Sequence, residues 1–145
     1  MSVKSDKAKE LFLMGYNCAQ AVSAVFADNY GITQDNILKM SCGFGGGMRN
    51  AEVCGAVSGA VMVIGMKYGN GSVNSPDVKA FCYQKTVEFT NRFREKNGSI
   101  ICRELLGADI SKDDGMKKAQ DANLFHTTCI EMITDAVDLL EQLQY

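Results

Sequence analysis

The 145-residue sequence contains one proline, one histidine and no tryptophan, and these scarcities narrow both its structure and its chemistry. A single proline and few runs of alternating polar and apolar residues leave little to interrupt helices or to indicate strands. With one histidine and no Gly-x-Ser-x-Gly turn, the chain offers no Ser/His/Asp arrangement. A hydrolase of that type is therefore not expected.

The sequence also has no long apolar segment and no run of residues that carry charge of a single sign. The longest apolar run extends roughly from Val53 to Met66, short of the ~20 residues that span a bilayer. The first ten residues are basic but lack the apolar stretch of a signal peptide. The net charge of −2 is mixed along the chain, without a basic stripe. We expect a cytoplasmic protein without membrane insertion and without a nucleic-acid partner.

Two familiar cofactor motifs are absent. No Cys-x-x-Cys pair occurs, which argues against a thioredoxin-type site and a zinc ribbon, and no Cys-x-x-Cys-His occurs, so ordinary haem attachment is excluded. The stretch Gly43-Phe44-Gly45-Gly46-Gly47 superficially looks like a phosphate cradle. No strand is expected before it and no Gly-Lys-Ser/Thr follows, so a nucleotide is not expected.

What the sequence does contain is apolar residues at helical spacing almost throughout. This pattern predicts an all-α, compact helical bundle of about six to seven helices with no substantial sheet, forming a single domain over residues 1–145. The expected helices are Lys4 to Met14, Cys18 to about Tyr30, Thr33 to Met40, Asn50 to about Tyr68, Pro76 to Asn97, Ser99 to Leu106 and about Met116 to Leu143, the last broken near Asn123.

Six cysteines are the main chemical signal, because cytosolic cysteines more often bind metal or react in redox chemistry than form structural disulfides. Three of them fall at expected helix starts, where free N–H groups favour a thiolate and lower the pKa. Arg103 is expected to act in the same direction on its neighbour Cys102. The expected cap–cysteine pairs are Asn17–Cys18, Asn50–Cys54 and Ser99–Cys102.

The remaining cysteines differ among themselves. Cys129 lies within the last expected helix, three residues after His126, and a His/Cys pair at that spacing can ligate a metal ion. A surface or half-buried histidine is the ordinary alternative. Cys82 lies on an apolar stripe and is expected in the core, whereas Cys42 precedes the glycine loop and is left open.

Glycines supply two further features. Free N–H groups of Gly45, Gly46 and Gly47 could support an anion or the sulfurs of a thiolate site, or the loop could be a plain turn between packed helices. Small residues also recur every four positions, at Ala51, Gly55 and Gly59. This ridge would suit either a close internal helix contact or a homodimer.

Four ordered motifs resemble a known family, named C_GCAxxG_C_C for its cysteine pattern and described as redox-active. The resemblance covers nearly the whole chain, and the Cys-Gly-Ala-x-x-Gly element is Cys54 to Gly59. It implies a small protein with four characteristic cysteines. The matching stretches are Asn17-Cys18-Ala19-Gln20-Ala21-Val22, Gly43 to Met48, Cys54-Gly55-Ala56-Val57-Ser58-Gly59-Ala60 and Cys102-Arg103-Glu104-Leu105-Leu106-Gly107.

By this resemblance the four family cysteines are Cys18, Cys54, Cys102 and, from order and spacing, Cys129. A similar domain occurs in split-Soret cytochromes, which also carry an iron–sulfur centre. This chain lacks their haem-attachment motif, so the resemblance implies at most a non-haem cluster.

Three functions stay open at this point. The first is thiol/disulfide redox chemistry by the four cysteines, with an unknown redox partner. The second is binding of an iron–sulfur cluster or zinc by the same four, for electron transfer or sensing. The third is a helical interaction module in which the cysteines only pack. Enzymatic activity, the electron donor and the metal are not decided by the sequence.

Overall fold

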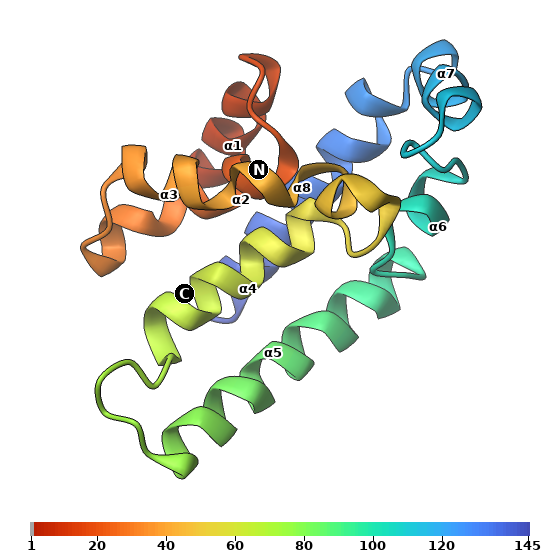
Figure 1. Ribbon diagram of the computed structural model, residues 1–145. Coiled ribbons are helices and arrows are strands. Elements are labelled where there is room, and N and C mark those ends of the chain that lie inside the picture. Colours follow the sequence, from red (N-terminus) through yellow and green to blue (C-terminus); the bar gives the residue numbers. More distant parts are fainter. Residues whose placement is uncertain (1) are drawn as a thin grey trace.

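The computed structural model describes residues 2–145 and consists of eight α-helices joined by short turns (Figure 1). The all-α prediction is confirmed. The count exceeds the expected six to seven because the last expected helix is divided at Asn123, whose φ is 56°. The helices are α1 (Val3–Leu13), α2 (Cys18–Ala27), α3 (Gln34–Ser41), α4 (Gly55–Tyr68), α5 (Pro76–Asn97), α6 (Cys102–Leu106), α7 (Asp113–Asp121) and α8 (Thr128–Gln142).

Helix α2 is the centre of the arrangement. It packs against α1, α3, α4 and α8, and alanines at 19, 21 and 27 are fully buried, which lets the surrounding helices approach closely. The larger core residues come from several elements: Phe26 from α2, Phe89 and Phe93 from α5, and Ile133 from α8. Figure 1 shows α5 running alongside α4, with α6 and α7 gathered at one corner.

Two glycines make the contact between α2 and α4 possible. A Cβ atom added at Gly59 would lie 2.7 Å from the Ala19 carbonyl oxygen, and one at Gly55 would lie 3.0 Å from the Cys18 Cβ. A side chain at Gly59 would require a shift of backbone, and one at Gly55 would require its neighbours to move by a few tenths of an ångström. The glycine ridge is thus occupied by an internal helix contact. Ala51 precedes α4 and is not part of that ridge on the helix.

Local capping signals predicted several helix starts correctly. Asn17 is the N-cap of α2 and forms a capping box, in which its side chain accepts from the Gln20 N–H and Gln20 accepts from the Asn17 N–H. Thr33 caps α3 by accepting from the Asn36 N–H. Pro76 occupies the first turn of α5.

The expected start of the fourth helix at Asn50 is wrong. Residues 46–49 instead make a left-handed turn, with φ of 62° at Gly46, 63° at Gly47, 58° at Met48 and 61° at Arg49. A left-handed conformation costs a residue with a side chain about 1–2 kcal/mol, so tertiary contacts must hold this turn. Helix α4 begins only at Gly55, with Cys54 as its N-cap.

The prediction that Ser99 caps the sixth helix is also wrong. The C-terminal helical region also begins earlier than predicted. Ile101 is the N-cap of α6, so Cys102 is its first residue, not its third. The Ser99 hydroxyl accepts from the Ile101 N–H and donates to Glu104 in a local turn. Helix α7 begins at Asp113, three residues before the expected start near Met116.

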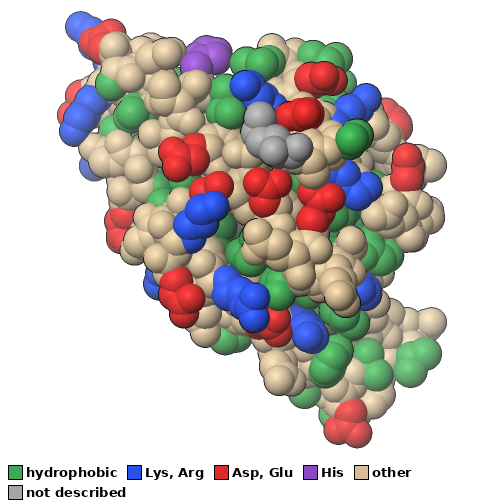
Figure 2. All heavy atoms as spheres, turned by 180° about the vertical axis from the view of Figure 1, so that it is seen from behind, with side chains coloured by type: hydrophobic (Ala, Val, Ile, Leu, Met, Phe, Trp, Pro, Cys, Tyr) green, Lys and Arg blue, Asp and Glu red, His purple; other side chains and the backbone are tan. Residues whose placement is uncertain are grey.

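The surface carries both signs of charge. On the face shown in Figure 2, lysine and arginine side chains are interspersed with aspartate and glutamate. None of the helices within residues 2–145 has the length and apolarity that crossing a bilayer requires.

The close contact of Gly59 with α2 can be tested with a matched pair of variants. Gly59→Ala should lower the free energy of unfolding by about 1–3 kcal/mol, because its Cβ meets the backbone of α2. Gly65→Ala in the same helix adds a Cβ to open space and should be neutral or stabilising by up to ~1 kcal/mol. Urea denaturation of both variants measures this. Equal effects of the two substitutions would contradict the close packing.

Candidate functional site

All four cysteines selected from the sequence line one cavity. Cys18, Cys54, Cys102 and Cys129 surround a space of about 100 Å³ between α2, α4, α6 and α8. Three of these cysteines are buried and Cys129 is partly buried. The rest of the wall is mainly apolar and consists of Phe12, Asn17, Gly46, Arg49, Gly55, Leu105, Leu106, Ile110, Phe125 and Met132.

A short backbone bridge brings Cys54 and Cys102 to the same place. The Cys54 N–H donates to the Ile100 carbonyl at 2.8 Å, and the Cys102 N–H donates to the Glu52 carbonyl at 2.6 Å. Between these bonds Val53 and Ile101 form an isolated antiparallel bridge. The two segments that precede α4 and α6 are thereby held side by side, each delivering one cysteine at a helix start.

Cys18 is positioned by the capped start of α2. Besides its capping box, Asn17 donates from its Nδ2 to the Cys42 carbonyl at 2.7 Å, which ties the helix start to the segment after α3. A Cβ at Gly45 would lie 2.4 Å from the Asn17 Cγ, so glycine is required there. The close contact at Gly55 then lets Cys18 lie directly against α4.

Cys129 lies near the start of α8 and completes the group. Its thiol lies close enough to that of Cys18 for each to shift the pKa of the other. It also packs against two separate apolar clusters, the main core and a smaller cluster formed by α6, α7 and their connections. Cys18 and Cys54 belong to the main core and Cys102 to the smaller cluster. The cavity therefore lies at the junction of the two clusters.

Burial sets the acidity of Cys54 and Cys102. Burial raises the pKa of the Cys54 thiol to about 11, although the N–H groups of Ala56 and Val57 at the start of α4 act in the opposite direction. Burial and then the neighbouring charges of Cys54 and Cys129 raise the pKa of Cys102 to about 12. Each thiolate would be poorly hydrated and close to others of the same charge.

Cys18 and Cys129 behave as a pair. The interaction with Cys129, followed by burial, raises the pKa of Cys18 well above its usual value. The same interaction lowers the pKa of Cys129. The lowered pKa predicted for Cys18, Cys54 and Cys102 is therefore wrong. At Cys54 and Cys102 burial outweighs the field of a helix N-terminus, and at Cys18 the interaction with Cys129 raises the pKa further than burial does. Of the four cavity cysteines, Cys129 is the one whose pKa is lowered.

Arg103 does not serve Cys102 as predicted. Its guanidinium pairs with the Glu52 carboxylate at 2.9 Å and donates to the Ala51 carbonyl at 3.1 Å. Arg49 takes that place: it lines the cavity, and its charge lowers the pKa of Cys102 against the effect of burial. The sequence carried only a weak sign of this role, an arginine just after the glycine loop.

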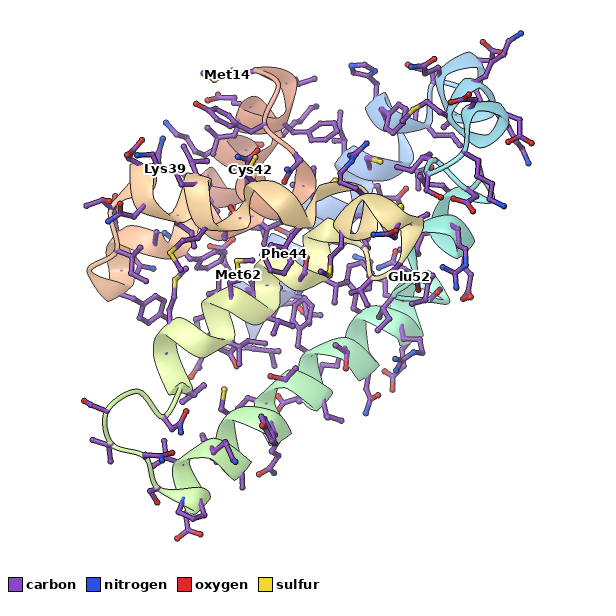
Figure 3. The ribbon with its side chains drawn as sticks, in the orientation of Figure 1. Met14, Lys39, Cys42, Phe44, Glu52 and Met62 are labelled. Atoms are coloured by element: carbon purple, nitrogen blue, oxygen red, sulfur yellow. The ribbon has the colours of Figure 1, made fainter. Side chains whose placement is uncertain are left out.

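Other candidates are separated from the cavity. His126 is exposed on a 3-10 turn (Leu124–His126) that precedes α8, so it does not share a helical face with Cys129 and does not line the cavity. Cys42 is exposed and Cys82 is partly buried against the core. In Figure 3, Cys42 lies where α3 ends. Glu52 lies farther along the segment that joins α3 to α4, on the side of α6.

The glycine loop contributes in part. Gly46 lines the cavity, whereas Gly45 packs against Asn17 and Gly47 packs against the Glu52 backbone. Within residues 2–145, no group of three or more His, Cys, Asp or Glu side chains has the geometry of a metal-ion site.

Comparison with known proteins identifies one family. The family model described as "Putative redox-active protein (C_GCAxxG_C_C)" matches residues 16–143. This range includes all four cavity cysteines and agrees with the resemblance seen in the sequence. No curated protein and no solved structure matches the chain.

Burial predicts a graded thiol reactivity in the reduced, metal-free protein. At neutral pH, iodoacetamide should modify exposed Cys42 at least about tenfold faster than Cys54 or Cys102, whose thiols are buried and weakly acidic. Peptide mass spectrometry against time measures the rates, and urea-unfolded protein serves as the control. Uniform labelling of the native chain would contradict the burial of these thiols.

The raised pKa of Cys54 also predicts a pH dependence of stability. An unfolded thiol ionises near pH 8.5, whereas the folded one holds its proton to about 11. Between these values the unfolded state has lost the proton, so stability falls by on the order of 1 kcal/mol per pH unit. Urea titrations of the metal-free protein at several pH values measure this. The Cys54→Ala variant should show a flatter decline, and an unchanged slope would refute the assignment.

Proposed function

Because the chain belongs to the C_GCAxxG_C_C family, we propose that it is a redox protein that holds an iron–sulfur centre for electron transfer or sensing. The observation that carries this proposal is the convergence of four cysteines, from four separate helices, on one cavity. A dithiol site needs only two cysteines. Four thiolates are the ligand set of common iron–sulfur clusters.

The cavity has the donor type that such a group needs and holds more space than a single water molecule occupies. One water needs roughly 10–15 Å³ of accessible space, and this cavity offers about 100 Å³. Its donors are sulfur atoms, which are the ligands that iron–sulfur clusters use. A polynuclear cluster takes its cysteine ligands on different iron atoms, so the four sulfurs need not surround a single ion.

The electrostatics of the four thiols also support the proposal. Burial and mutual repulsion disfavour thiolates at Cys18, Cys54 and Cys102. Cationic iron would offset these charges and allow deprotonation, as metal binding generally does for buried cysteines. Proton release on loading is thus part of the proposal.

The protein groups around the sulfurs have defined tasks in this proposal. The N–H groups of Ala56 and Val57 at the start of α4 stabilise negative charge on the Cys54 sulfur. Apolar side chains such as Phe125 and Met132 limit access of water. The bound group would supply one-electron redox chemistry, and these surroundings would set its potential.

A second candidate function rests on the pair Cys18–Cys129. Their interaction lowers the pKa of Cys129, which makes it the best nucleophile of the four. The Cys129 thiolate would attack a partner disulfide and release one partner thiol. Cys18 would then displace the second partner thiol, which leaves a Cys18–Cys129 disulfide and a fully reduced partner.

Anaerobic purification tests the main proposal. We expect coloured protein that contains iron and acid-labile sulfide, with loss of most of both in single Cys→Ser variants at 18, 54, 102 and 129. The variants Cys42→Ser and Cys82→Ser are matched controls, because these cysteines lie outside the cavity, and they should retain the full content.

The opposite result identifies the second candidate. If the anaerobic protein contains no iron and mild oxidation yields a Cys18–Cys129 disulfide in the peptide map, the iron–sulfur proposal is wrong and the dithiol function is supported. Oxidation that pairs neither of these cysteines would rule out the dithiol function.

A further inference from the structure

Arg49 is held beside the cavity by an unusual piece of backbone. The left-handed turn at residues 46–49 includes Met48 and Arg49, where this conformation is unfavourable for residues with a side chain. Such strain persists only where the surrounding structure imposes it, and it concentrates at functional sites. The turn directs residue 49 back over residue 46.

The contact between Arg49 and Gly46 fixes the position of the guanidinium. A Cβ atom at Gly46 would lie 2.6 Å from Arg49 Nη1 and 3.1 Å from Cζ, so the guanidinium packs directly on the glycine. Both residues line the cavity. Glycine at 46 therefore leaves room for a cation in the wall of the cavity.

Arg49 is also free of carboxylates. Among residues 2–145 it makes no salt bridge and no side-chain hydrogen bond, whereas Arg103 nearby is paired with Glu52. Arg49 is the charged side chain of the cavity wall, the other lining residues being apolar, sulfur-containing or uncharged polar groups. Its positive charge is thus available to the sulfur site.

We propose that Arg49 is the charge-compensating residue of the four-cysteine centre and raises its reduction potential. The proposal rests on the proposed iron–sulfur function and names the residue that tunes it. When an external one-electron donor reduces the centre, the donor loses one electron and the centre becomes more negative by one unit. A nearby cation stabilises the reduced state more than the oxidised state, and Arg49, although exposed to solvent, lines the cavity.

The test is a spectroscopic redox titration of the anaerobically purified protein with dithionite as the donor. Arg49→Gln should shift the midpoint potential to a more negative value, and Arg49→Lys, which keeps the charge but not the planar group, should shift it less. Arg103→Gln is the matched control, since it removes the same charge from a residue outside the cavity wall. Its potential should stay near that of the unchanged protein.

Gly46→Ala provides an independent variant. Its methyl group would displace the flexible end of Arg49 without changing the net charge, so it should shift the potential in the same direction as Arg49→Gln. Residue 46 has a φ of 62°, so this variant should also lose about 1–2 kcal/mol of stability. If Arg49→Gln does not assemble the centre, Arg49→Lys and Gly46→Ala carry the test.

The outcomes separate this inference from the proposed function. A centre that forms in all variants with unchanged potentials overturns the role of Arg49 and leaves the iron–sulfur proposal intact. An equal shift in Arg49→Gln and Arg103→Gln also overturns it, because the effect would then be one of net charge. Absence of any centre in the unchanged protein refutes both.

Discussion

The sulfur site depends on two backbone hydrogen bonds between residues that lie far apart in the sequence. The Cys54 and Cys102 N–H groups each donate to a carbonyl of the opposite segment, at Ile100 and Glu52, around the Val53–Ile101 bridge. Because a peptide backbone offers one donor and one acceptor per residue, this pairing fixes the register of the two segments. A slip of one residue would turn one cysteine away from the cavity.

The second constraint is the small-residue contact between α2 and α4. Gly55 and Gly59 allow Ala19 to approach their backbone, and this approach brings Cys18 to the cavity. The family's Cys-Gly-Ala-x-x-Gly element thus has a physical meaning: one cysteine as ligand or thiol, and two glycines that admit the neighbouring helix. Cys129 then joins the main core to the smaller apolar cluster.

Features decided by neighbouring residues were predictable from the sequence, and features decided by distant ones were not. Asn17 and Thr33 cap the helices that follow them because capping is local. Asn50 and Ser99 do not, because the long-range bridge sets where α4 and α6 begin. The four cysteines selected from the sequence line one cavity, but the lowered pKa predicted for three of them is wrong. A helix N-terminus contributes about 1 kcal/mol, less than burial among other thiols costs.

The central claim is that the four cysteines form one redox centre at the junction of the two apolar clusters. Diffraction at the iron absorption edge, from crystals grown without oxygen, tests it most directly. If these cysteines hold an iron–sulfur centre, the anomalous map should show iron within the cavity, bonded to the sulfurs of Cys18, Cys54, Cys102 and Cys129. A cavity without iron, with Cys18 and Cys129 joined by a disulfide, or iron bound away from these sulfurs, would contradict it.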